Sequence, residues 1–248
     1  MKKTLLIILG VTISLIAVFA IITKLGVIPN YLGITYLCPE LIMNEDTEYD
    51  PDNPLNNYTL PGGDIALKPV IYLYPTRQEK ISVKLNYPGD IFVTYPKYDG
   101  KWEVIANPNG KLINTKDQRE YSYLFWEGTE YESFEYDMTT GYVVKGEDTL
   151  TFLQNKLEEI GLLPHEYNEF IVYWLPKMIN NEYNLIHFAT DEEYANRVTL
   201  DIIPTPDSVL RVFMVFKNLE DDIDIKPQDI QSFERNGFTV VEWGGTER

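Results

Sequence analysis

The chain has 248 residues, a formal net charge of −17, one cysteine and 18 tyrosines. This length and an apolar content of 44% predict a globular protein with its own core and exclude a disordered chain. The acidic charge argues against nucleic-acid binding, because nothing basic offsets its repulsion of phosphates. A single cysteine leaves no internal disulfide to hold the fold.

The N-terminus predicts a membrane anchor. Residues 4–22 are uncharged and mostly apolar, and as a helix they span roughly 28 Å, close to the hydrocarbon thickness of a bilayer. Lys2 and Lys3 favour a cytoplasmic N-terminus. The alternative is a signal peptide cleaved after the small-x-small pattern at 18–20, which leaves a secreted protein. We prefer a retained anchor over residues 1–24, because the apolar run continues beyond that pattern.

Residues 25–65 are predicted to form an acidic linker outside the cytoplasm. The stretch 44–64 is rich in Asp, Asn, Pro and Gly and poor in core residues. Its alternating acids resemble a calcium loop, but the glycine and the bidentate glutamate of that loop are missing. We therefore predict a solvated linker and no metal. Cys38 fits a small, partly buried apolar residue, with an intermolecular disulfide as the alternative.

Residues 66–146 are predicted to form an antiparallel sheet or sandwich. The stretch KPVIYLYP at 68–75 is apolar on both faces and is bounded by prolines, as in a central strand, and its pattern indicates no chemistry. Residues 80–87 alternate with a period of two. Further strands are expected at 91–96, 102–106, 121–128 and 141–144, with a hairpin loop at 106–111.

Residues 147–248 are predicted to be an α+β part of the same globular domain, 66–248. Leucines at helical spacing and Gly161 indicate a helix over 146–161. A second helix is expected at 226–237. Strands are expected at 169–174, 183–188, 197–203, 209–216 and 238–243. The fold class is therefore α+β, mostly β, and whether the two parts share one sheet is left open.

Several blocks together resemble a family of bacterial secreted or membrane-anchored proteins. They are KPVIYLYP at 68–75, YLFWEG at 123–128, VYWLPKM at 172–178 and GFTVVEWGG at 237–245. The resemblance covers about residues 66–245 and implies an extracytoplasmic location. It implies no reaction and no catalytic residue.

The YLFWEG block is the first candidate for chemistry. Trp126 could stack on a sugar ring while Glu127 acts as an acid. Glycoside hydrolysis needs a second carboxyl across the scissile bond, and Glu130, Glu169 and Glu242 are the candidates. The alternative is that Trp126 is a core residue and Glu127 lies at a strand end.

An aromatic platform is the second candidate. Trp102, Trp174 and Trp243, with the many tyrosines, could present ring faces to a ligand. Trp126, Tyr123 and Trp174 are the candidate binding residues, and the alternative is that these aromatic residues form the core and partly exposed sheet faces. The histidines indicate no metal site, because the HEYNE motif at His165 lacks the second histidine of a zincin and His187 lies on a predicted strand. No cofactor is predicted.

These observations favour a membrane-anchored extracytoplasmic domain that binds a surface ligand or partner. Wall glycan, peptide and a surface protein are the expected ligand classes. The first alternative is a glycan-directed hydrolase that acts through carboxylates, with Glu127 and Glu169 as candidate catalytic residues. The second is a structural component of an envelope assembly.

Overall fold

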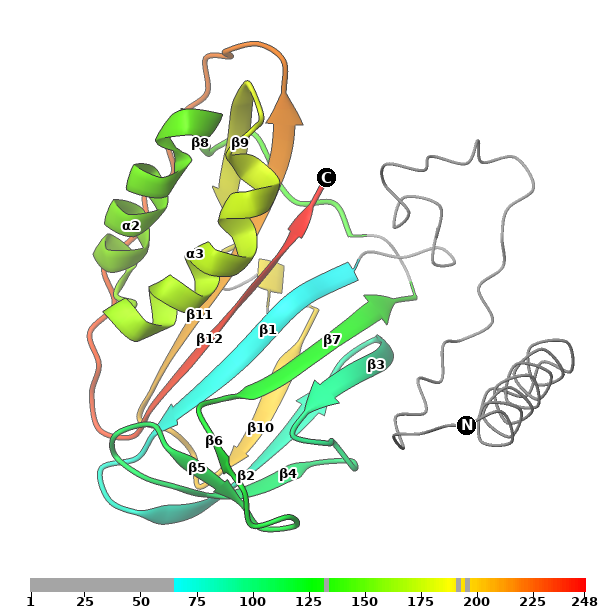
Figure 1. The fold of residues 1–248 in the computed structure, drawn as a ribbon, viewed down its shortest axis with the longest axis vertical. Helices are drawn as coiled ribbons and strands as arrows, with labels where there is room; N and C mark the ends of the chain where they lie inside the picture. The colour runs from blue at the N-terminus through cyan, green and yellow to red at the C-terminus, as the bar shows by residue number, and fades with distance from the viewer. Residues whose placement is uncertain (1–64, 132–133, 191–192, 195–196) are drawn as a thin grey trace, which may run out of the picture. The chain divides into compact units, whose positions relative to one another are not determined.

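The computed structural model describes residues 65–131, 134–190, 193–194 and 197–248. These residues form an α+β fold, mostly β, in three layers (Figure 1). Two helices pack on one face of a seven-stranded sheet, and a five-stranded sheet packs on its other face.

The large sheet has the strand order β3-β7-β1-β12-β11-β9-β8. The neighbours β11 and β12 are parallel, whereas the other pairs are antiparallel. The strand bounds are β1 Ile65–Tyr74, β3 Gly89–Tyr95, β7 Leu124–Glu130, β8 Tyr142–Lys145, β9 Tyr183–Phe188, β11 Ser208–Leu219 and β12 Thr239–Glu247.

The small sheet is antiparallel, with the order β10-β2-β4-β5-β6. Its strands are β2 Glu79–Asn86, β4 Trp102–Ala106, β5 Leu112–Asn114, β6 Glu120–Tyr121 and β10 Thr199–Ile203. The predicted alternation in β2 is confirmed, since Ile81, Val83 and Leu85 are buried against the large sheet. The predicted hairpin loop before β5 is confirmed as well, with Gly110 at φ +84°.

Helices α2 (Thr149–Ile160) and α3 (Pro164–Met178) cover the other face of the large sheet. A short 3-10 turn, η2 (Gly146–Asp148), leads into α2. The predicted end of α2 is confirmed, because Gly161 adopts φ +119° and caps the helix. The core beneath the helices includes the large side chains Phe170, Trp174 and Trp243.

The two predicted parts of the domain are interleaved. Strands from both parts pair in the large sheet, where β1 from the first part lies between β7 and β12. The small sheet also mixes them, because β10 pairs with β2. The question that the sequence left open is therefore answered, since the two parts share both sheets.

The prediction of a strand at 169–174 is wrong, because these residues lie in the middle of α3. Beta-branched and aromatic residues suggested a strand, but Pro164 fits the first turn of a helix. The Glu166 carboxylate accepts a hydrogen bond from the Leu163 amide at 2.7 Å, as at a capped N-terminus. Phe170, Trp174 and Met178 follow at intervals of four residues and are all buried, so tertiary packing favours the helix.

The prediction of a helix at 226–237 is also wrong. Because β12 is parallel to β11, the chain must return along the length of β11, roughly 40 Å at 3.3 Å per residue. A helix over 226–237 advances about 18 Å, so the seven other residues of the connection would have to be almost fully extended to cover the rest. The segment runs without helix, and the Gln228 side chain bonds both the amide and the carbonyl of Phe188, each at 2.8 Å.

The predicted anchor at 1–24 and almost all of the predicted linker at 25–65 lie outside the described residues. Within the part of the chain that the structure describes, no helix is both long enough and apolar enough to cross a membrane.

Candidate ligand-binding site

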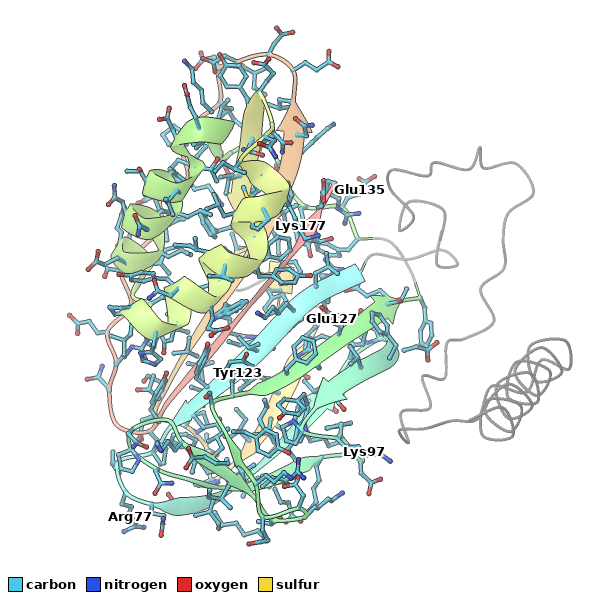
Figure 2. All side chains as sticks on the ribbon, viewed as in Figure 1. Arg77, Lys97, Tyr123, Glu127, Glu135 and Lys177 are labelled. Carbon is cyan, nitrogen blue, oxygen red and sulfur yellow. The ribbon has the colours of Figure 1, made fainter. Side chains whose placement is uncertain are left out.

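The helices leave one part of the large sheet uncovered. Strands β1, β7 and β3 continue beyond α3, and their helix-side residues form a surface that we call the ledge (Figure 1). Figure 2 shows Tyr123 and Glu127 on this side of the sheet and Lys177 on the neighbouring helix. The ledge consists of Lys68, Val93, Tyr95, Tyr123, Phe125 and Glu127.

A β-bulge places Lys68 on the α3 side of the ledge. The register of β1 slips by one residue against both β7 and β12 between Ala66 and Val70. Lys68 has φ +48°, a left-handed conformation that costs a non-glycine residue on the order of 1 kcal/mol. Pro69 has no amide hydrogen to continue the ladder. The freed Lys68 amide instead donates a hydrogen bond to Glu127 Oε1 at 3.0 Å.

The Lys68 side chain joins the ledge to α3. Its Nζ lies 3.7 Å from Glu169 Oε2, and 5.2 Å from the ring centroid of Tyr173 and 5.7 Å from that of Trp243. Such cation–π contacts are stronger where water is excluded. The Lys68 side chain is only 19% exposed, whereas that of Glu169 is 48% exposed, so the Glu169 carboxylate faces solvent beside a held ammonium group.

One stripe of α3 forms the wall of the ledge. His165, Glu169, Tyr173 and Lys177 recur every four residues and therefore share one side of the helix. Lys177 Nζ stacks over the Tyr173 ring at 5.6 Å from its centroid. The stripe places one lysine, one carboxylate and aromatic surface along the ledge.

Glu127 is the more sheltered of the two carboxyls. Burial raises its pKa above the ordinary value of 4.5, while the Lys68 amide and the charges of Lys68 and Lys177 act in the opposite direction. The raised pKa favours the protonated carboxyl, which can donate a proton or a hydrogen bond.

The tyrosines of the site are hydrogen-bond donors. Burial raises the pKa of Tyr173, and the Glu127 carboxylate adds to the effect. Burial also raises the pKa of Tyr123, with the Glu169 charge as the next cause. Both phenols therefore stay protonated at neutral pH.

The far end of the ledge offers exposed aromatic surface. Tyr95 is paired with Phe125 across the strands and is 58% exposed. Its ring centroid lies 4.9 Å from that of Tyr121, with the planes at 68°. This edge contact holds the Tyr95 ring while leaving surface for a ligand.

The structure brings together three of the predicted site residues. Glu127 and Glu169 both contact Lys68, and Tyr123 lies beside Glu169. The predicted binding roles of Trp126 and Trp174 are wrong, because both side chains are fully buried and present no ring to a ligand. Trp126 faces the core between the sheets, where large aromatic rings add the most apolar burial.

The other two predicted carboxyl partners of Glu127 lie on the opposite face of the sheet. Glu242 is fully buried and accepts a hydrogen bond from Arg211 Nε at 2.8 Å. Glu130 is buried and accepts one from Arg197 Nε at 3.1 Å. The sheet backbone separates both from Glu127, which leaves Glu169 as its partner.

The histidines belong to other contacts. His165 Nε2 lies 2.8 Å from Tyr74 Oη. His187 is buried, with Nδ1 2.9 Å from the Thr140 carbonyl and Nε2 3.5 Å from Glu193. Among the described residues, no three His, Cys, Asp or Glu side chains gather as metal ligands would.

Sequence reasoning missed Lys68, Tyr173 and Lys177. For Lys68 the signal is a lysine directly before a proline inside an apolar strand, where a bulge re-aims the side chain. For the other two, the signal is the helical spacing of 165–177, which the strand interpretation concealed.

Comparisons with known proteins give one partial likeness. An uncharacterised protein in the bglA 3' region of Butyrivibrio fibrisolvens is 48% identical over 65 residues. The match covers 25% of this chain and 66% of that protein, just under two thirds of its length. No protein-family model matches the chain, and no solved structure matches it.

Proposed function

We propose that this chain is a membrane-anchored extracytoplasmic protein that binds a surface ligand on the ledge. A wall saccharide is the favoured ligand. Membrane attachment rests on residues 4–22, and the resemblance to bacterial secreted and membrane-anchored proteins agrees with it.

One observation carries the proposal. Along the uncovered part of the sheet and the neighbouring stripe of α3, the exposed ring of Tyr95 lies near two carboxyls, two lysines and two protonated tyrosines. Sugar rings stack on aromatic faces, and their hydroxyls need both donors and acceptors. Two lysines lie near two carboxyls, so the site has no large excess of either charge, which suits a neutral ligand better than a strongly charged one.

A thermal-shift screen of the full-length protein tests this. The panel contains the N-acetylglucosamine tetramer, soluble wall fragments and short cationic peptides. A ligand at a hundred times its Kd stabilises the fold by about 2.7 kcal/mol. We expect a shift with a saccharide that Glu169→Gln and Tyr95→Ala reduce. Glu158→Gln on α2 and Val172→Ala on the outer side of α3 are the matched controls. Shifts with peptides alone, or equal shifts in all variants, contradict the proposal.

Hydrolysis of the bound saccharide is the second candidate. Glu127 is sheltered and has a raised pKa, whereas Glu169 is half exposed beside the Lys68 ammonium. Two carboxyls in different environments are the usual arrangement for an acid and its charged partner.

Product analysis separates the two functions. If the ledge is catalytic, the tetramer is cleaved, and Glu127→Gln or Glu169→Gln lowers the rate about a hundredfold or more. Glu158→Gln should leave the rate unchanged. Binding without cleavage supports the binding function alone.

A further inference from the structure

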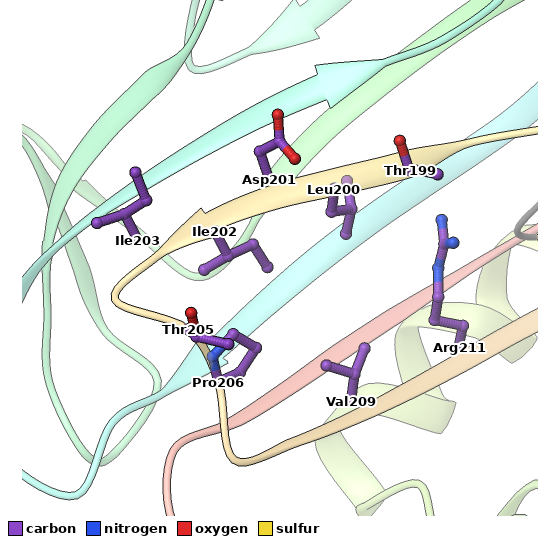
Figure 3. Close-up of a pocket in the computed structure, with 9 residues that line it drawn as sticks. All are labelled: Thr199, Leu200, Asp201, Ile202, Ile203, Thr205, Pro206, Val209 and Arg211. Carbon is purple, nitrogen blue, oxygen red and sulfur yellow. The ribbon is translucent and has the colours of Figure 1, made fainter.

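A groove of about 580 Å³ lies away from the ledge, between the two sheets. One wall is β10, the edge strand of the small sheet, and the other is the start of β11 (Figure 3). The turn at Thr205–Pro206 closes one end. At the other end, Arg211 Nη1 donates a hydrogen bond to the Val198 carbonyl at 2.7 Å.

The groove runs along an unpaired strand edge. In the part of the chain that the structure describes, β10 pairs with β2 and with no other strand. Alternate amides and carbonyls of its other edge therefore point toward the groove. Edge strands are often protected by charged side chains or proline, and Thr199–Ile203, which is TLDII, has Asp201 as its one charge and no proline.

The walls of the groove fit apolar side chains. Leu200 and Ile202 point from β10 toward β11, and Val209 faces them from β11 (Figure 3). Val209 is 42% exposed because the small sheet ends at β10 and does not cover it. Arg211 adds no net charge, since Glu242 balances it.

We propose that an extended peptide of a partner protein binds here as a sixth strand of the small sheet. Strand addition satisfies the free backbone groups and gives specificity through alternate side chains. Charge favours a partner peptide with a basic residue, because Asp201 lines the groove and the whole chain has a net charge of −17. A basic residue opposite Asp201 forms a cross-strand ion pair. Apolar residues opposite Leu200, Ile202 and Ile203 cover surface that is open, including the 70% exposed Ile203.

The test uses a designed probe peptide, Gly-Val-Leu-Lys-Leu-Thr-Gly, with capped ends and a fluorophore. In an antiparallel arrangement its lysine lies opposite Asp201 and its valine opposite Ile203. We expect saturable binding to the full-length protein by fluorescence anisotropy. Two versions are N-methylated on alternate amides. Only one set of amides faces β10, so one version should lose binding and the other keep it.

A charge exchange on the protein locates the site. Asp201→Lys should weaken the probe about three- to tenfold, since attraction becomes repulsion. A probe with glutamate in place of lysine should recover the affinity on that variant. Asp222→Lys makes the same change of net charge at an exposed position outside the groove, and it should have little effect.

Hydrogen exchange gives an independent readout. The probe should slow exchange of amides in 199–203. The proposal is overturned by absence of binding at millimolar probe, by equal binding of both methylated versions, or by equal effects of the two charge variants. Protection of the free-edge amides without probe also overturns it, because a segment of this chain then occupies the edge.

Discussion

The two halves of the helix-side face of the large sheet differ in what covers them. Under α2 and α3, strands β12, β11, β9 and β8 contribute apolar side chains to a closed core. Beside α3, Tyr95 of β3 is exposed, and Tyr123, Phe125 and Glu127 at the start of β7 and within it are only partly buried. Helix α3 contributes to both halves. Its residues Glu166, Phe170, Trp174 and Met178 are buried against the sheet, whereas the stripe that begins at His165 and ends at Lys177 lines the ledge.

This difference shows why tryptophan is a poor guide to a site here. All four tryptophans are fully buried, and the exposed aromatic surface of the ledge comes from tyrosine. Successive side chains of a strand point to opposite faces, so a glutamate directly after a tryptophan lies on the other face of the sheet. Glu127 therefore faces the ledge because Trp126 faces the core.

The largest expected effect is in the covered half. Trp174→Ala should lower the free energy of unfolding by about 3–5 kcal/mol, because it leaves a cavity between α3 and the sheet. Urea denaturation at fixed pH measures it. A loss below about 1 kcal/mol would show that Trp174 is not the core residue described here.

A smaller loss is expected for Gly245→Ala. An added Cβ lies 2.5 Å from the Met214 carbonyl oxygen and 2.6 Å from Trp174 Cζ2, so we expect a loss of about 1–3 kcal/mol. Gly100→Ala meets no neighbour but has φ +71°, and should cost about 1 kcal/mol. Thermal denaturation compares them, and a neutral Gly245→Ala contradicts this packing.

The contribution of Glu127 to the free energy of unfolding should change with pH in the opposite direction from that of a surface carboxylate in an ion pair. Because the folded pKa of Glu127 is raised, the folded state holds its proton more tightly than the unfolded chain does. The Glu127 contribution is fully present below about pH 4.5 and declines as the pH rises through the folded pKa. Glu127→Gln should therefore gain stability relative to the natural chain across that window. Urea titrations between pH 4 and 8 test the sign, and a parallel pH profile of the two proteins would refute it.

The smallest effect on stability is expected at Tyr95. Tyr95→Ala should change the free energy of unfolding by about 0.5 kcal/mol or less, because the side chain is mostly exposed. Its affinity for the N-acetylglucosamine tetramer should fall at least about fivefold by calorimetry. Unchanged affinity would remove Tyr95 from the binding surface.

Local pattern predicted most strands but not how they pair. The alternation in 80–87 and the prolines around 69–75 were sufficient to predict β2 and β1, because each pattern depends only on neighbours in sequence. The strand prediction for 169–174 failed because burial against the sheet overrides the propensity of Ile171 and Val172. The helix prediction for 226–237 failed because the parallel order of β11 and β12 is a property of the whole sheet.

The site was predicted only in part, because some of its features are local in sequence and others depend on the whole fold. Glu127 and Glu169 stood out as carboxyls near aromatic residues, and their approach depends on α3 lying beside β1. Lys68 was missed because its role arises from a bulge and from a backbone amide that turns out of the ladder. A strand pattern alone does not reveal either feature.

Hydrogen exchange of the full-length protein with the N-acetylglucosamine tetramer tests the central claim most directly. If the ledge is the ligand site, exchange slows in residues 91–95, 123–128 and 165–177, and stays unchanged in 199–211. Protection confined to 199–211, or no protection anywhere at saturating saccharide, would contradict the claim.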